Sequence, residues 1–133
     1  MQPKKIGIGI VVIIVIGIIA AAVGGSAVGG SSGGAPSNAV VNNAPGSSTP
    51  GCEPDCFIPT TATIRAGGTI TWMNGDTAAH TATAGTATNG PSDVWDSGLI
   101  MAGSSFSHTF EAAGTFDYFC MVHPWMSGVV ITR

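Results

Sequence analysis

The chain has 133 residues, with seven acidic and four basic side chains and a formal net charge of −3 at pH 7. This length fits one small domain plus additional segments, and the acidic balance argues against nucleic acid as a partner. All nine aromatic residues lie beyond residue 56, whereas residues 6–51 carry no charged side chain. We therefore expect only the C-terminal part to build a hydrophobic core.

Residues 1–23 have the pattern of a membrane anchor or signal segment. Lys4 and Lys5 precede an apolar run, Ile6 to Val23, which as a helix would span about 27 Å, close to the ~30 Å hydrocarbon core of a bilayer. The positive-inside rule keeps the N-terminus in the cytoplasm and places the rest of the chain outside it. Because the run exceeds the ~7 to 15 residues of a usual signal sequence, we expect an uncleaved anchor. Cleavage among the small residues at 20–27, and hence secretion, is the alternative.

Residues 24–51 form the next segment, which is rich in Gly, Ser, Ala, Asn and Pro. Such a composition buries too little apolar surface to offset the entropy of ordering, so we predict a disordered, flexible linker. With a reach of roughly 30 Å, the linker would let the following domain meet membrane-bound partners. A simple spacer explains the same composition.

Cys52 and Cys56 stand at the start of the C-terminal domain, which we predict to comprise residues 52–133. The extracytoplasmic location is oxidising, so we predict a disulfide between these two residues. A second metal site at this pair is the alternative, but only two thiols are present and no histidine lies nearby.

Short segments rich in β-branched and aromatic residues, separated by glycine, fill the rest of the domain. The expected strands lie at 62–65, 69–74, 105–110, 116–120 and 128–132, with residues 66–68 joining the first two as a hairpin and a turn at 114–115. Several short strands at such spacing, without helical stretches, predict an all-β sandwich.

A short loop near the C-terminus carries three ligand types at three-residue intervals: Cys120, His123 and Met126. Thiolate and thioether favour Cu(I), imidazole suits Cu(II), and two histidines with one cysteine and a weak axial methionine form a blue-copper electron-transfer site. This loop therefore predicts one type 1 copper ion. Met126 as an ordinary core side chain is the competing interpretation.

One more histidine is needed from elsewhere, and the chain offers His80 and His108. His80 follows the predicted strand 69–74 in a loop that can face Cys120, so we prefer it. His108 lies between two inward-facing phenylalanines and shares their side of the strand. A lone histidine in such a strand is more often structural than a ligand.

These residues carry a family resemblance. The run Cys56 to Pro59, the segment Thr69 to Asn74, the pair His80-Thr81 and the run Gly114 to Cys120 resemble a plastocyanin/amicyanin-type cupredoxin. The C-x2-H-x2-M spacing resembles that of amicyanins, and the anchor with a polar linker is similar to archaeal membrane-associated halocyanins. The resemblance implies a cupredoxin-like Greek-key β-sandwich in which His80, Cys120 and His123 are equatorial copper ligands and Met126 is the axial one.

The family pattern differs at one position and implies a second role for the copper loop. Many members have Asn after the first histidine, where this chain has Thr81, whose hydroxyl would have to join the two ligand loops. The resemblance also implies that the edge of His123 reaches the surface beside Pro124 and Trp125, which would form an apolar docking patch for redox protein partners. Inward packing of Trp125 is the alternative.

Three functions compete on these grounds. The complete ligand set favours an extracytoplasmic blue-copper electron carrier that shuttles single electrons between membrane-associated partners, rather than an enzyme. If Met126 does not bind, an open copper site would admit a small molecule such as nitric oxide and act as a redox enzyme. Copper delivery or storage is the third, and it fits less well because transfer proteins favour labile, exposed ligands.

Overall fold

The computed structural model describes residues 34–133 of the chain. The predicted membrane segment, residues 1–23, lies outside the described residues, and none of the described residues belongs to a helix that is long and apolar enough to cross a membrane. The described part contains nine β-strands: β1 (Asn38–Asn43), β2 (Phe57–Ile58), β3 (Thr61–Ile64), β4 (Gly68–Asn74), β5 (Thr83–Thr86), β6 (Gly90–Asp96), β7 (Ser105–Phe110), β8 (Gly114–Phe119) and β9 (Ser127–Thr132).

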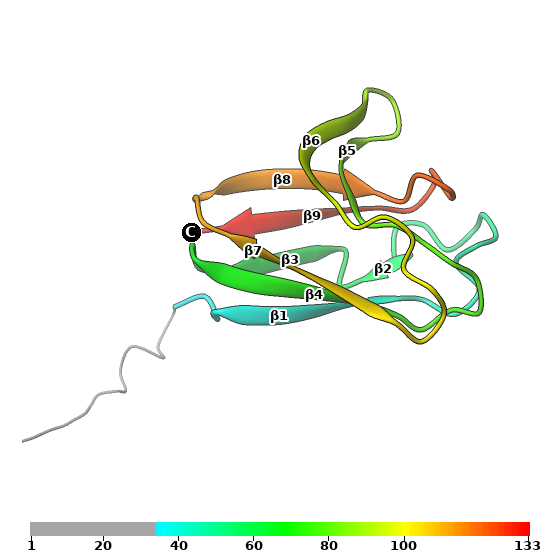
Figure 1. Ribbon diagram of the computed structural model, residues 1–133, viewed down its shortest axis with the longest axis horizontal. Helices are drawn as coiled ribbons and strands as arrows, with labels where there is room; N and C mark the ends of the chain where they lie inside the picture. The colour runs from blue at the N-terminus through cyan, green and yellow to red at the C-terminus, as the bar shows by residue number, and fades with distance from the viewer. Residues whose placement is uncertain (1–33) are drawn as a thin grey trace, which may run out of the picture. The chain divides into compact units, whose positions relative to one another are not determined.

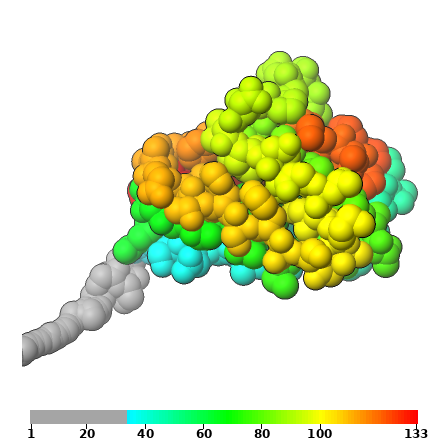
Figure 2. All heavy atoms as spheres, viewed as in Figure 1, coloured from blue at the N-terminus to red at the C-terminus, as the bar shows by residue number. Residues whose placement is uncertain are grey.

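The strands form two sheets that face each other, with strand orders β2-β1-β4-β7 and β3-β9-β8-β5-β6 (Figure 1). The pairs β1–β4 and β3–β9 are parallel, and the other pairs are antiparallel. The turn between β5 and β6 projects from the body of the domain (Figure 2). The predicted all-β sandwich is therefore confirmed.

Trp72 occupies the centre of the core between the two sheets. Alternate residues of β4 are buried, as expected for a strand with one face on the core. The completely buried ring of Trp72 contacts Tyr118 of β8 and Trp95 of β6, with ring centroids 5.3 and 5.7 Å apart. Trp95 in turn stacks on the half-buried His108. The aromatic residues of the C-terminal part thus build one core, and His108 belongs to its edge.

The predicted linker, residues 24–51, is wrong at its C-terminal end. Residues 38–43 form β1, which pairs with β4 along its full length, and the compact unit extends from Ala35 to Arg133. The segment has no aromatic or charged residue, yet Val41 is fully buried against the core. The low average hydrophobicity of the segment predicted a linker, but residues 38–43 form a strand because β4 and β2 supply its backbone hydrogen bonds.

The predicted hairpin at 62–74 is also wrong, although both of its strands exist as β3 and β4. These strands belong to different sheets: β3 pairs with β9, and β4 lies between β1 and β7. Residues 65–67 therefore cross between the layers of the sandwich. The turn expected at Gly114 and Thr115 lies earlier, because both residues already belong to β8. Strands β2, β5 and β6 were not predicted.

Candidate metal centre

Two loops at one end of the sandwich carry the predicted ligands, at the end opposite the C-terminus (Figure 1). The first follows β4 and contains His80, whose backbone forms a two-hydrogen-bond bridge with Ile100. The second joins β8 to β9 and contains Cys120, His123 and Met126. Backbone hydrogen bonds from Cys120 to Met126 and from Met126 to His123 close this second loop on itself. Rigid strands therefore position both loops.

His80, Cys120 and His123 lie together, with their ligand atoms within 4.8 Å of one another. The sulfur of Cys120 is 3.8 Å from Nδ1 of His80 and 3.6 Å from Nδ1 of His123. The two Nδ1 atoms are 3.1 Å apart. His80 and Cys120 are completely buried, whereas His123 is partly exposed. The thiol of Cys120 and the imidazole of His123 therefore meet the imidazole of His80, which lies 40 and 43 residues earlier in the chain.

Asp76 orients His80 from behind and was missed by the sequence interpretation. Its Oδ2 lies 2.7 Å from Nε2 of His80, and its Oδ1 accepts a hydrogen bond from the N–H of Gly46 at 2.9 Å. When Nε2 carries the proton and donates to the carboxylate, Nδ1 keeps its lone pair free for a metal. The only sequence signal was an acid four residues before a ligand histidine.

The charge of Asp76 is stabilised in place. Burial by itself opposes ionisation, but hydrogen bonds from Gly46, His80 and the N–H of Thr77 outweigh it and hold the pKa of Asp76 well below its usual range. The pKa of His123 is also lowered, mainly by burial and then by the neighbouring His80. Both effects favour a neutral imidazole and an ionised carboxylate, the states that a metal site requires.

Thr81 connects the two ligand loops. Its N–H donates to the sulfur of Cys120 at 3.3 Å, and its hydroxyl oxygen accepts from the N–H of Met121 at 2.8 Å. The Thr81 hydroxyl also contacts Thr83, which donates to Asp96. This side chain therefore takes the joining role that was expected of its hydroxyl.

Met126 is completely buried at the end of the copper loop. Its backbone is tied to both Cys120 and His123, and its side chain lies in the interior rather than at the surface. The described geometry places the thioether on the same short loop as two ligands and leaves its bond to a metal as a prediction.

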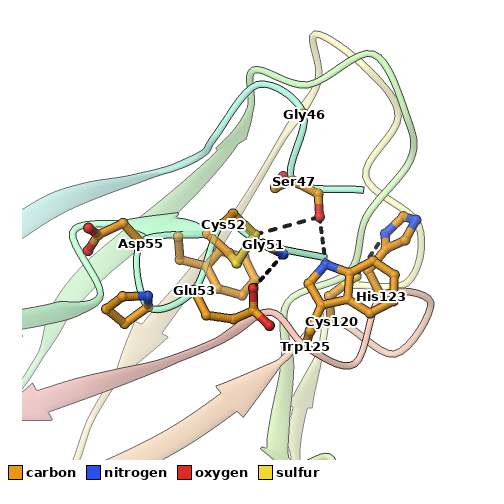
Figure 3. Close-up of a disulfide and its surroundings, with 12 residues drawn as sticks. Gly46, Ser47, Gly51, Cys52, Glu53, Asp55, Cys120, His123 and Trp125 are labelled. Atoms are coloured by element: carbon orange, nitrogen blue, oxygen red, sulfur yellow. Dashed lines mark hydrogen bonds between the residues drawn. A yellow bond between two sulfur atoms is a disulfide. The ribbon is translucent and has the colours of Figure 1, made fainter. Parts of the chain in front are cut away.

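Pro124 and Trp125 differ in their surroundings. Pro124 is exposed, whereas Trp125 is half-buried and packs against His123, with ring centroids 5.4 Å apart. The indole N–H of Trp125 donates to the carbonyl oxygen of Ser47 at 2.9 Å (Figure 3). Trp125 is thus anchored to Ser47 on one side and borders His123 on the other. It is partly packed inward and partly available to a docking surface.

Cys52 and Cys56 form the expected disulfide. Their sulfurs are bonded to each other, so the alternative of a second metal site at this pair does not apply. His108 lies outside the cluster of three ligands and contacts Trp95 and Phe110 instead. Burial lowers its pKa, as expected for a structural histidine.

The donor set fits copper. A thiolate, two imidazole nitrogens and a nearby thioether form the set that blue-copper sites use, and zinc sites of four protein ligands rarely include a thioether. The hydrogen bond from Thr81 to the Cys120 sulfur suits a thiolate acceptor, and the carboxylate behind His80 is a common partner of a metal-bound imidazole. The surrounding β-scaffold holds these donor atoms close together.

Comparison with known sequences gives matches to copper proteins. Residues 55–133 match the family described as copper binding proteins, plastocyanin/azurin family. The chain is 32% identical over 77 residues to the amicyanin of Paracoccus versutus, with 58% of each chain covered. It is 33% identical over 72 residues to the plastocyanin of Scenedesmus fuscus, covering 50% of this chain and 74% of that one. The chain therefore spans little more than half the length of the amicyanin.

Comparison with solved structures gives the same architecture. A purple cupredoxin from Nitrosopumilus maritimus superposes with a TM-score of 0.66 at 26% identity, covering 71% of this chain and 99% of that one. The crystal structure of amicyanin from Paracoccus versutus superposes with a TM-score of 0.52 at 27% identity, covering 72% and 81%. All four predicted ligands lie within the residues matched by the family.

Proposed function

Because this chain belongs to the plastocyanin/azurin family of copper-binding proteins, we propose that it is a blue-copper electron carrier. The family binds one type 1 copper ion, and His80, Cys120, His123 and Met126 form the candidate site. The observation that carries the proposal is the convergence of one sulfur and two Nδ1 atoms from two separate loops. The proposed role is to pass single electrons between redox proteins.

Bound copper supplies one-electron chemistry by alternating between Cu(I) and Cu(II). The protein's own contribution is to hold the ligands still, because ligand rearrangement slows electron exchange. Asp76 fixes the orientation of His80. Thr81 joins the two loops, because its N–H donates to the Cys120 sulfur and its hydroxyl accepts from the N–H of Met121. Burial of His80, Cys120 and Met126 excludes water from three of the four donors.

The exposed side of His123 supports a docking role for the surrounding surface. The copper loop presents Met121, Val122 and Pro124 to solvent, and Trp125 borders the imidazole. Leu99 and Met101 are also exposed on either side of Ile100, which pairs with His80. An apolar surface around a partly exposed ligand suits a transient partner that approaches His123. We assign this surface to redox protein partners.

The sequence pattern of residues 1–23 supports a location outside the cytoplasm. In this proposal the apolar run anchors the chain, as in halocyanin-like proteins, and the domain meets membrane-associated donors and acceptors on the extracytoplasmic side. Cleavage after the run would instead release a secreted carrier. The Cys52–Cys56 disulfide is compatible with either location, because both are oxidising.

Copper loading of the purified protein tests the site. Addition of Cu(II) should produce an intense visible band from thiolate-to-copper charge transfer, and Cys120→Ser should abolish it. Absence of the band, or its survival in Cys120→Ser, would refute the assignment. A Ser107→Ala variant at an exposed position of β7 serves as a control that should keep the band.

Electron exchange tests the role against that of an enzyme. The reduced protein should exchange electrons with an oxidised redox protein, such as a cytochrome c, without consuming a small substrate. Turnover of nitric oxide at a copper site that binds it directly would favour the enzyme instead. The complete burial of Met126 supports the closed site of a carrier.

A further inference from the structure

The loop between β1 and β2, residues 44–56, lies against both halves of the copper site. We call it the clamp loop. It is closed at its base by the hydrogen bond from the N–H of Ala44 to the carbonyl of Cys56 and by the Cys52–Cys56 disulfide. Internal backbone hydrogen bonds from Ser47 to Ala44 and from Thr49 to Gly46 shape its first half. Gly46 and Ser47, the two residues of this loop that bond to the ligand loops, are therefore held in a defined position.

The first contact runs from the clamp loop to the loop that carries His80. The N–H of Gly46 donates to Oδ1 of Asp76, whose Oδ2 lies 2.7 Å from Nε2 of His80. Asp76 is 6% exposed, and its carboxylate also accepts a hydrogen bond from the backbone N–H of Thr77. The clamp loop thus supports the carboxylate that orients a predicted ligand.

The second contact runs from the clamp loop to the loop that carries Cys120 and His123. The carbonyl of Ser47, a completely buried residue, accepts the indole N–H of Trp125 at 2.9 Å. Figure 3 shows Trp125 between this carbonyl and the imidazole of His123. Trp125 therefore contacts the clamp loop through its indole N–H and the partly exposed ligand, His123, through its ring.

We propose that the clamp loop is a positioning element that sets the reduction potential of the copper site through Asp76 and Trp125. The proposal rests on the proposed copper function and deepens it. Asp76 and Trp125 act through His80 and His123 and are positioning residues rather than ligands. One backbone N–H and one backbone C=O of adjacent residues, Gly46 and Ser47, thereby connect two loops that the sequence separates by about 40 residues.

The direction of the effect follows from electrostatics. A buried carboxylate one imidazole ring away from the metal stabilises Cu(II) more than Cu(I), because its attraction acts on the greater charge at reduced dielectric. Asp76 therefore lowers the potential. Trp125 acts in a second way, because its ring packs against one side of the His123 imidazole. Loss of the hydrogen bond from Trp125 to Ser47 would loosen that imidazole.

Asp76→Asn in the copper-loaded full chain tests the electrostatic contact. We expect the thiolate-to-copper band to remain and the reduction potential to rise by about 59 mV or more, which corresponds to a tenfold change in the equilibrium constant of a one-electron couple. Asp55→Asn removes the same charge from the exposed part of the clamp loop, on the side away from His123 (Figure 3), and should leave the potential nearly unchanged. Equal potentials in Asp76→Asn and Asp55→Asn would overturn the proposal.

Trp125→Phe tests the second contact, because phenylalanine keeps a ring beside His123 but lacks the donor to Ser47. In the copper-free protein, the amide of Gly46 should exchange its hydrogen faster in Trp125→Phe than in wild type, and the imidazole nitrogen signals of His123 should broaden in NMR spectra. The variant should also show an altered copper spectrum. Unchanged exchange and spectra would show that the clamp loop does not act through Trp125.

Removal of the closure tests the clamp loop as a unit and uses the double variant Cys52→Ala with Cys56→Ala. It should shift the potential in the same direction as Asp76→Asn, and an unchanged potential in the folded variant would count against the proposal. If the double variant fails to fold, the Asp76 and Trp125 variants still decide the question. Failure of wild type to develop the visible band would instead refute the copper function itself, so the two failures are distinguishable.

Discussion

The hydroxyl oxygen of Thr81 accepts the backbone N–H of Met121 at 2.8 Å, across the gap between the two ligand loops. Thr81 is 2% exposed, and its own N–H donates to the Cys120 sulfur. Since Thr83 donates to Asp96, the Thr81 hydroxyl proton points to Thr83 and leaves its oxygen free to accept. Thr81 therefore provides a hydrogen-bond acceptor for the backbone of the loop that carries Cys120 and a hydrogen-bond donor for the Cys120 sulfur.

Thr81→Val tests this connection. Valine has nearly the same shape but leaves the N–H of Met121 without its acceptor, so we expect the free energy of unfolding to fall by about 1–3 kcal/mol. The amide of Met121 should also exchange its hydrogen faster. Denaturant unfolding of the copper-free protein measures the first effect. Thr81→Ser keeps the hydroxyl and should lose less stability than Thr81→Val; equal losses would contradict the role assigned to this hydrogen bond.

Met126→Gln tests the predicted axial ligand. An amide oxygen is a harder donor than a thioether and suits Cu(II) better, so the reduction potential should fall, by about 59 mV for each tenfold change in the equilibrium constant. Electrochemistry of the copper-loaded protein measures the shift. Met121→Gln makes the same substitution at an exposed position of the same loop and is the matched control. Similar potentials in both variants would mean that Met126 is a core residue only.

His108 should make stability depend on pH. Its imidazole stacks on Trp95 with ring centroids 5.2 Å apart, and burial lowers its pKa below the ordinary value of about 6.5. On acidification the unfolded chain therefore binds a proton before the folded one does. The stability that neutral His108 contributes is present above pH ~6.5 and is lost as the pH falls from there towards the folded-state pKa.

A comparison of wild type with His108→Phe isolates this effect, because His80 and His123 are common to both proteins. The difference in unfolding free energy, measured without copper, should move in favour of His108→Phe as the pH is lowered from 7.5 to 5. A difference that stays constant over this range would show that His108 titrates alike in both states.

Val41→Ala tests whether β1 belongs to the folded domain. Val41 is fully buried, so its truncation should reduce the free energy of unfolding by about 1.5–3 kcal/mol. Val40 is the adjacent residue on the same strand and is 47% exposed, so Val40→Ala should change stability by less than about 0.5 kcal/mol. Thermal unfolding of both variants gives the comparison. Equal, negligible effects would restore the interpretation of this segment as a linker.

The local pattern was sufficient for the features that depend on neighbours in the chain. The spacing of Cys120, His123 and Met126 indicated a copper loop because one short turn can bring all three side chains together. Alternation of apolar residues predicted β7 at its observed bounds, 105–110. The disulfide was predicted from two cysteines four residues apart, together with the expectation of an oxidising location.

The pairing of strands was harder to predict, because it depends on partners distant in sequence. The sequences of β3 and β4 resemble a hairpin, yet the two strands do not pair with each other. β3 pairs with β9, and β4 pairs with β1. β1 has a composition typical of linkers and becomes a strand only because β4 supplies its hydrogen bonds and the core covers Val41.

The sequence by itself determined the kind of metal, since thiolate, imidazole and thioether donors are chemical properties of single residues and their spacing in one loop is local. Only the tertiary structure decided what surrounds those donors: Asp76 behind His80, Thr81 between the loops, and Ser47 beside Trp125. These contacts join segments separated by up to 78 residues. Whether such segments meet depends on the packing of two whole sheets, which no local pattern encodes.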